Sequence, residues 1–236
     1  MAAIAAETAR EARASSEVFP GALLASGAAA LFVGTLFYAR LTPELGLPAL
    51  PAGRAQALAD ALKLGAQPLA LAGGFSFLGD CLLLAASIAL ASGNRRAGNL
   101  DSAGWALMAD SVAVALMFDS MTAALIFPLA HGADPAPFLA VKSWFDFLFA
   151  AGNVPYGLGF IAVLCADMRR GEPLLPRALA YVGIAVGAAA AISGLGHVLG
   201  VLHLPLVIGL SVTFGCVILV ALGVQIARRD PSLAIR

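Results

Sequence analysis

Six long apolar runs limit what this chain can fold into more than any other feature. The hydrocarbon core of a membrane is roughly 30 Å thick, and a helix that rises about 1.5 Å per residue needs about 17 to 25 mostly apolar residues to cross it. Six windows of that length and character occur, and each is predicted to be a transmembrane helix. They cover residues 20–41, 68–91, 103–129, 136–166, 177–200 and 203–227.

The composition leads to the same fold class, because 61% of the residues are hydrophobic and 12% are charged. In a typical soluble domain about a quarter of the residues are charged. The predicted fold is therefore all-α, a polytopic membrane bundle of six transmembrane helices. Residues 1–19 are expected to be a cytoplasmic segment, residues 20–228 the membrane domain with an outer loop at 42–67, and residues 229–236 a cytoplasmic tail.

The positions of Lys and Arg predict the orientation, because cytoplasmic loops carry an excess of these residues. Of the 14 Lys and Arg residues, ten lie on one side of a six-span topology, three lie on the other, and Lys142 lies inside a span. The richer side is predicted to be cytoplasmic, so both termini are expected inside (N-in, C-in). It holds Arg10, Arg13, Arg95, Arg96, Arg169, Arg170, Arg177, Arg228, Arg229 and Arg236.

The charge pattern and the N-terminal segment narrow the cellular context. The formal net charge is zero, and basic residues form no stripe interleaved with aromatic ones, so no nucleic-acid partner is expected. The first 19 residues lack the apolar core and cleavage site of a secretory signal, so the first span is expected to stay in the mature protein. The expected surroundings are the lipid bilayer of a bacterial plasma (inner) membrane.

Five charged side chains inside the predicted spans are the first candidates for a functional site. Ionisable groups at membrane depth are costly, and they commonly mark substrate pathways, ion pathways or proton relays. Each of the five is therefore treated as a functional-site hypothesis. They are Asp80, Asp110, Asp119, Lys142 and Asp146.

The fourth span carries a polar stripe along one face. Lys142 and Asp146 are four residues apart, Asn153 is seven further on, and Tyr156 completes the same face. Pro155 removes an intrahelical hydrogen bond, so a kink is expected beside the stripe. Irregular backbone at mid-membrane lines the binding site of many transporters. An ordinary proline kink packed against neighbouring helices is the alternative.

Depth in the membrane predicts which charged groups meet. With the N-terminus inside, Asp119 and Asp146 each lie about ten residues, or roughly 15 Å, from the outer ends of their spans. Lys142 lies one turn closer to the outer surface, and Asp80 lies at a similar depth in the second span. Three carboxylates against one ammonium leave an excess of negative charge, so at least one carboxyl is expected to bind a proton or a cation. Asp110 is on the opposite face of the third span from Asp119, and a separate contact is expected for it.

The histidines and cysteines give weaker patterns. His131, His197 and His203 are expected at the outer interface and are the candidate metal ligands, but their spacing matches no known ligand pattern. Histidines satisfied by water and backbone are the simpler interpretation, so no metal site is predicted. The three cysteines lack CxxC spacing and are expected to fill the packed interior. These residues identify no cofactor.

Small residues recur four apart at Gly183 and Gly187 and at Gly196 and Gly200, which lets helix backbones approach closely. These pairs are predicted to be packing surfaces, within the chain or against other subunits. The segment 174–200, LLPRALAYVGIAVGAAAAISGLGHVLG, resembles the late helices of small uncharacterised bacterial membrane proteins, in which a proline-arginine pair precedes a Gly-rich span. The resemblance covers about a tenth of the chain and implies no activity.

Three functions are compatible with these residues. The preferred hypothesis is a small transporter or channel with a proton- or cation-linked site, gated near Pro155. The second is a non-catalytic subunit or assembly factor of a larger membrane complex, in which the buried charges pair. Apart from the lipid bilayer, the partners considered are other membrane subunits or further copies of this chain in a homo-oligomer. The third is a membrane enzyme acting on a lipid, quinone or isoprenoid, with acid–base or metal chemistry at the outer interface. The candidate binding residues are Asp80, Asp119, Lys142, Asp146, Asn153 and Tyr156.

Overall fold

The protein is a helical bundle over the residues that the structure describes. The computed structural model describes residues 19–37, 66–93, 99–202 and 204–228, and six of its helices are long and apolar enough to cross a membrane. The six-span prediction is therefore confirmed. The predicted N-terminal segment, the C-terminal tail and nearly all of the outer loop lie outside the described residues. The helices are Phe19–Phe37, α3 (Ala66–Gly93), α4 (Asn99–Ala124), α5 (Ile126–Ala130), α6 (Ala136–Met168), α7 (Arg177–Val198) and α8 (Pro205–Arg228).

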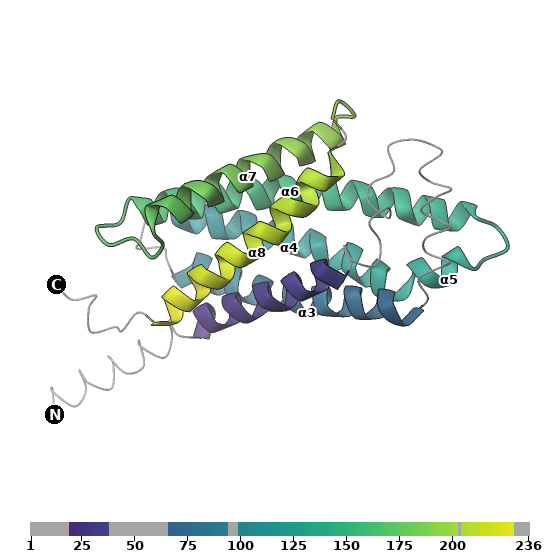
Figure 1. The fold of residues 1–236 in the computed structure, drawn as a ribbon, viewed down its shortest axis with the longest axis horizontal. Coiled ribbons are helices and arrows are strands. Elements are labelled where there is room, and N and C mark those ends of the chain that lie inside the picture. The colour runs from purple at the N-terminus through teal and green to yellow at the C-terminus, as the bar shows by residue number, and fades with distance from the viewer. Residues whose placement is uncertain (1–18, 38–65, 94–98, 203, 229–236) are drawn as a thin grey trace.

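Four of the long helices pack in chain order. α3 lies against α4, α4 against α6 and α6 against α7 (Figure 1). From the end of α7, α8 crosses back over the bundle toward the Phe19–Phe37 helix, which itself lies against α3 (Figure 1). Buried apolar side chains fill the space between the helices. The main core includes Leu24, Leu83, Trp105, Met108, Phe160, Leu164, Leu219 and Leu222.

Apolar side chains also cover the outside of the bundle. Large exposed residues occur on every long helix, among them Phe37, Ile88, Met117, Leu158, Ile192 and Phe214. In lipid such an exterior is solvated by the acyl chains, and helix association then depends on close packing and polar contacts rather than on the hydrophobic effect. The exposed apolar surface therefore fits an integral membrane protein in contact with the bilayer.

Close backbone packing at Gly79 joins α3 to the Phe19–Phe37 helix. A Cβ atom added at Gly79 would lie 2.6 Å from the backbone nitrogen of Leu31 and 2.8 Å from the carbonyl oxygen of Gly27. Such distances are far below normal van der Waals contact, and both atoms belong to a helix backbone. The two helices can therefore approach this closely only because position 79 lacks a side chain.

Replacing Gly79 with Ala is expected to lower the free energy of unfolding by about 1–3 kcal/mol, because overpacking forces the two helices apart. The matched control is Gly74→Ala in the same helix, where an added Cβ meets no atom within 4 Å. Thermal unfolding of both variants in one detergent measures the difference. A Gly79→Ala protein as stable as Gly74→Ala would contradict the packing described here.

The third membrane helix ends earlier than the predicted span 103–129. α4 stops at Ala124, and the short helix α5 follows after a one-residue break. Pro128 explains the break, because it has no amide hydrogen for the carbonyl of Ala124 and its ring clashes with that carbonyl in a continuous helix. α5 packs beside the first turns of α3 and α6.

Gly200 caps α7 and does not pack against another helix of the described chain, because a Cβ added there would meet no atom within 4 Å. Its φ is 70°, a backbone conformation that side chains disfavour. The amide of Gly200 donates to the carbonyl of His197 at 3.0 Å, and that of Val201 donates to the carbonyl of Gly196 at 2.9 Å, which is a Schellman motif. Gly187 does pack as predicted, since a Cβ there would lie 2.9 Å from a backbone oxygen of α6.

Two buried carboxylates tie together the ends of α4 and α6. Asp101, in the first turn of α4, accepts a hydrogen bond from Arg170 Nη2 at 2.6 Å. Asp167, in the last turn of α6, accepts the backbone amides of Leu174 and Leu175 at 2.9–3.2 Å. Buried carboxylates need such donors to offset lost hydration. Both residues fall just outside the predicted spans, so the sequence pattern does not mark them as buried charges.

Candidate functional site

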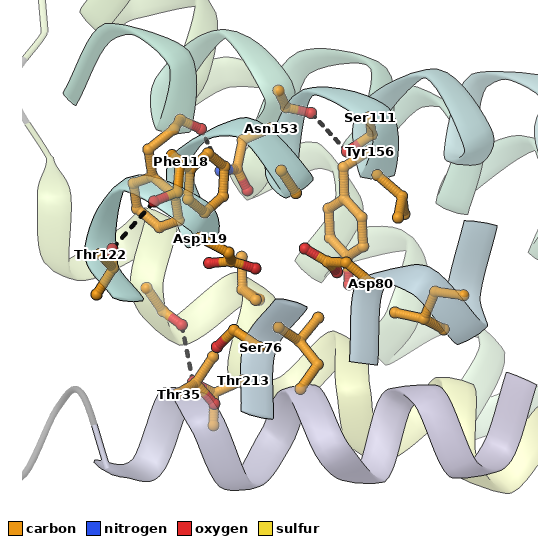
Figure 2. A pocket seen from close by; sticks show the side chains of 18 of the residues that line it. Thr35, Ser76, Asp80, Ser111, Phe118, Asp119, Thr122, Asn153, Tyr156 and Thr213 are labelled. Atoms are coloured by element: carbon orange, nitrogen blue, oxygen red, sulfur yellow. Dashed lines mark hydrogen bonds between the residues drawn. The ribbon is translucent and has the colours of Figure 1, made fainter. Parts of the chain in front are cut away.

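A cavity of about 440 Å³ lies inside the bundle, between the Phe19–Phe37 helix, α3, α4, α6 and α8. Small-molecule sites commonly measure roughly 300–1,000 Å³, so this cavity is large enough for a small ligand. Below it is called the pocket. Polar side chains from all five helices stand among its apolar lining (Figure 2). They are Thr35, Ser76, Asp80, Ser111, Asp119, Thr122, Asp146, Asn153, Tyr156 and Thr213.

Asp80 of α3 and Asp119 of α4 point toward each other in the middle of the pocket (Figure 2). Their residues are 1% and 6% exposed, and the two carboxyl groups are close enough to interact. A carboxylate can only accept hydrogen bonds, so a bond between two carboxyl groups needs a proton on one of them. The pair can therefore hold one proton, or a cation when both groups are ionised.

The polar stripe predicted on the fourth span is buried. Asp146, Asn153 and Tyr156 line the pocket, and Lys142 is buried beside them. Lys142 Nζ forms an ion pair with Asp146 one turn along α6, as their spacing allows. The ammonium also lies 5.0 Å from the centroid of the Phe145 ring.

The four charged candidates are thus arranged as two pairs from three helices. Asp80 meets Asp119 across the boundary between α3 and α4, and Lys142 meets Asp146 within α6. Three of the four line the pocket, whereas Lys142 does not. The positive charge of Lys142 is matched by Asp146, so the carboxyls of Asp80 and Asp119 form the part of the pocket that can take a further positive charge.

α6 runs through Pro155 as one helix from Ala136 to Met168. Just before the proline, the hydroxyl of Ser111 on α4 donates to the carbonyl of Gly152 at 2.8 Å. This contact joins α4 to α6 at the pocket wall. A proline inside a helix removes one backbone hydrogen bond, and side-chain donors from neighbouring helices commonly stabilise membrane helices at such positions.

Four buried polar atoms that line the pocket have no hydrogen-bond partner among the described residues. They are Asp80 Oδ2, Asp119 Oδ2, Asn153 Oδ1 and Tyr156 Oη. The amide nitrogen of Asn153 donates to the carbonyl of Phe149 at 2.7 Å, which leaves its oxygen as the free group. Three of these four atoms are therefore acceptors. A buried polar atom without a partner is costly, so such a set points to a bound ligand, ion or water.

The hydroxyl groups around the pocket add further acceptors. Ser111, Thr122, Thr213 and Thr35 each donate to a backbone carbonyl, at 2.8, 3.1, 2.9 and 2.8 Å. Each hydroxyl proton is therefore engaged, while the oxygen lone pairs stay available. These residues are not among the candidates predicted from the sequence. One signal was present, because Thr122 lies three residues after Asp119 and so shares its helix face.

Three aromatic rings form one cluster in the pocket wall. Phe118 of α4 makes edge contacts with Phe145 and Phe149 of α6, with ring centroids 5.5 and 5.3 Å apart. The rings of Phe145 and Phe149 are 6.3 Å apart and nearly parallel. All three residues line the pocket. This group is called the phenylalanine cluster below.

The other candidates from the sequence lie away from the pocket. His131 is exposed, His197 is half-buried, and His203 is outside the described residues. Among the residues that the structure describes, no group of three His, Cys, Asp or Glu side chains is placed to hold a metal ion. Cys216 is buried as expected, but Cys81 is exposed, so the prediction for the cysteines is only partly right.

Asp110 does not contribute to the pocket. It is exposed on the surface of α4, about eleven residues or roughly 16 Å from the start of that helix. The helical spacing predicted that Asp110 and Asp119 lie on opposite faces, and the structure confirms this.

A comparison with family models, with curated proteins and with solved structures finds no match to this chain.

Proposed function

We propose that this protein is a small membrane transporter or channel that moves a proton or a small cation through the pocket. The observation that carries this proposal is the pair of carboxyls, Asp80 and Asp119, that point into an internal cavity at membrane depth (Figure 2). A buried ionisable pair is costly in a bilayer, and such pairs commonly serve ion or proton pathways.

The polar chemistry of the pocket favours a ligand that donates hydrogen bonds or carries positive charge. Its free groups are the carboxylate oxygens of Asp80 and Asp119, the amide oxygen of Asn153 and the phenolic oxygen of Tyr156. No Lys or Arg is among the described residues that line it. An anion in the pocket would lie next to these oxygen atoms with no positively charged side chain to offset the repulsion. A proton, a monovalent cation or an ammonium group would satisfy them.

The packing of α8 suggests how the pocket opens and closes. At Gly209, which lines the pocket, an added Cβ would meet no atom within 4 Å. At Gly223, nearer the other end of α8, it would lie 2.6 Å from the backbone nitrogen of Ala25 and 2.8 Å from the carbonyl of Gly21. The space is therefore open beside the first half of α8 and closed beside the second half. Transport through the pocket would require α8 to separate from the Phe19–Phe37 helix at Gly223.

The predicted N-in, C-in orientation would place the open half of α8 toward the outer side of the membrane. The first turn of α8 follows the fifth span, whereas its last turn packs against the start of the Phe19–Phe37 helix, where a Cβ added at Gly21 would lie 2.5 Å from the backbone nitrogen of Ala227. Within this proposal, a bacterial plasma membrane remains the expected location. The pocket would then receive its ligand from outside and release it inward, or the reverse.

Flux into liposomes tests the proposal. Purified protein would be reconstituted with a dye inside that responds to protons, to sodium or to potassium, or with radiolabelled methylammonium outside, and a gradient of each ion would be applied in turn. We expect at least one of these ions to move faster than in protein-free liposomes, in proportion to the amount of protein. Flux equal to the leak for every ion would contradict the proposed function.

A second candidate, a non-catalytic subunit or assembly factor, is favoured by the exposure of Asp110. A carboxylate that faces lipid near the middle of a helix is unfavourable, so a partner chain covering it would stabilise the protein. On this hypothesis, mild extraction recovers a larger complex, and Asp110→Leu releases a monomer from it. Ser120→Leu, also exposed on α4, is the control and should leave the complex intact. Native mass spectrometry of the wild-type protein as a bare monomer would exclude this candidate.

A further inference from the structure

We infer that the cation held in the pocket is a small organic ammonium with an apolar body, and that it enters beside the first half of α8. This inference rests on the proposed function, since it names the class of cation that the same site would take. Four features of the pocket carry it: its size, its phenylalanine cluster, its exposed leucines and its charge.

The pocket is larger and less polar than a site for a bare metal ion. Hard divalent cations such as Ca²⁺ and Mg²⁺ are held by shells of several oxygen ligands at short distances. Among the described residues, no group of three acidic, His or Cys side chains is placed to hold a metal ion. The cavity of about 440 Å³ instead combines a few acceptors with many apolar side chains. This combination is typical of sites for small organic molecules.

The phenylalanine cluster supplies the surface that an organic cation needs. The faces of aromatic rings attract ammonium groups, and they also pack against apolar ligand atoms. The protein already uses one of these rings in this way, because the ammonium of Lys142 lies 5.0 Å from the centroid of the Phe145 ring. Phe118 and Phe149 line the same pocket as Asp80 and Asp119. An ammonium at the two carboxyls could therefore place its apolar body against these rings.

The mouth of the pocket is lined by leucines. Leu206 and Leu210 of α8 both line the pocket, and they are 73% and 47% exposed. Residues that line a cavity and are also exposed mark where it reaches the surface. In a bilayer this surface faces lipid, because α8 is one of the six apolar spans. An apolar body attached to an ammonium group would pass such a mouth more easily than a hydrated metal ion.

The charges inside the pocket match a single ammonium group. Lys142 neutralises Asp146, which leaves the pair of Asp80 and Asp119 to interact with the ligand. An ammonium group donates two or three hydrogen bonds, and Asp80 Oδ2, Asp119 Oδ2 and Asn153 Oδ1 are acceptors without partners among the described residues. When a cation displaces the proton that the two carboxyls share, the proton passes to the solvent.

Binding of phenethylammonium to the full-length protein in detergent tests this inference. Isothermal titration calorimetry measures the dissociation constant. We expect phenethylammonium to bind, and sodium, potassium and the uncharged analogue propylbenzene to bind at least tenfold more weakly. Asp80→Asn should weaken phenethylammonium binding about tenfold or more. Phe149→Leu should weaken it about 2- to 30-fold, whereas Phe147→Leu, an exposed position on α6, should not change it. Circular dichroism checks that each variant is folded.

The outcomes separate this inference from the proposed function. Liposome flux of protons, sodium or potassium without phenethylammonium binding would overturn the inference and leave the proposed function standing. Binding that is unchanged in both folded variants, Asp80→Asn and Phe149→Leu, would also overturn the inference, because the ligand would then bind elsewhere. Binding that depends on both residues, with no flux of phenethylammonium or of any other cation, would support the pocket assignment and contradict the transporter.

Discussion

Flux through liposomes containing Asp119→Asn is expected to fall about 10- to 100-fold below that of the wild-type protein. The substitution keeps the size of the side chain but removes its charge. A hydrogen bond to a charged group contributes about 1.5–3 kcal/mol, and losing it lowers the affinity for the transported ion by roughly the same factor as the expected fall in flux. Asp80→Asn should have an effect of similar size, because Asp80 and Asp119 form one pair. Initial rates at equal amounts of reconstituted protein measure the change.

The matched control for these variants is Asp134→Asn. Asp134 is exposed, lies outside the pocket and accepts the amide of Ala136 at 2.9 Å, a role that Asn can also fill. This variant should transport at the wild-type rate. Thermal unfolding should show that all three variants are folded. Wild-type flux in a folded Asp119→Asn protein would remove Asp119 from the site.

Lys142→Met is expected to lower the free energy of unfolding by about 3–5 kcal/mol. Lys142 is 3% exposed and pairs with the buried Asp146, so its removal leaves the Asp146 carboxylate inside the bundle without the ammonium that pairs with it. Met has a similar length and fills much of the same volume, so little of the loss would come from a cavity. The midpoint of thermal unfolding in detergent, or of unfolding in a denaturing detergent titration, measures the effect.

The double variant Lys142→Met with Asp146→Leu should recover most of this stability. Replacing a whole buried ion pair with apolar residues is often neutral or stabilising, whereas removing one partner is not. Asp146→Leu by itself should also be destabilising, because it leaves the ammonium buried. If the double variant is as unstable as Lys142→Met, the loss arises from packing and the ion pair is not its cause.

Much of the fold follows from local properties of the sequence. Mean hydropathy over about 20 residues is enough to place six membrane helices, because each must satisfy its own backbone in lipid. The buried stripe on α6 follows from helical periodicity, and the contact of Lys142 with Asp146 follows from a spacing of four residues. The break at Leu125 could also have been predicted, since Pro128 excludes the hydrogen bond that a continuous helix requires.

The arrangement of the site depends on how distant helices pack, which a single sequence does not specify. The sequence placed Asp80, Asp119 and Asp146 at similar depths, but depth does not say which pairs meet. α8 lines the pocket through Leu206, Gly209 and Thr213, and nothing in its apolar sequence signals this. The close contact of α8 with the first helix depends on glycines in both, which become informative only when the two helices are seen together.

Chemically blocking the pocket is the most direct test that the transported ion passes through it. Thr213 of α8 lines the pocket, and Ser120 of α4 is exposed outside it. After the three native cysteines are replaced with Ala, Thr213→Cys and Ser120→Cys would each be treated in liposomes with methyl methanethiosulfonate, which forms a disulfide with the thiol and releases methanesulfinate. Our account predicts that modification stops flux only in Thr213→Cys and that a reducing agent restores it. Undiminished flux through fully modified Thr213→Cys protein would contradict it.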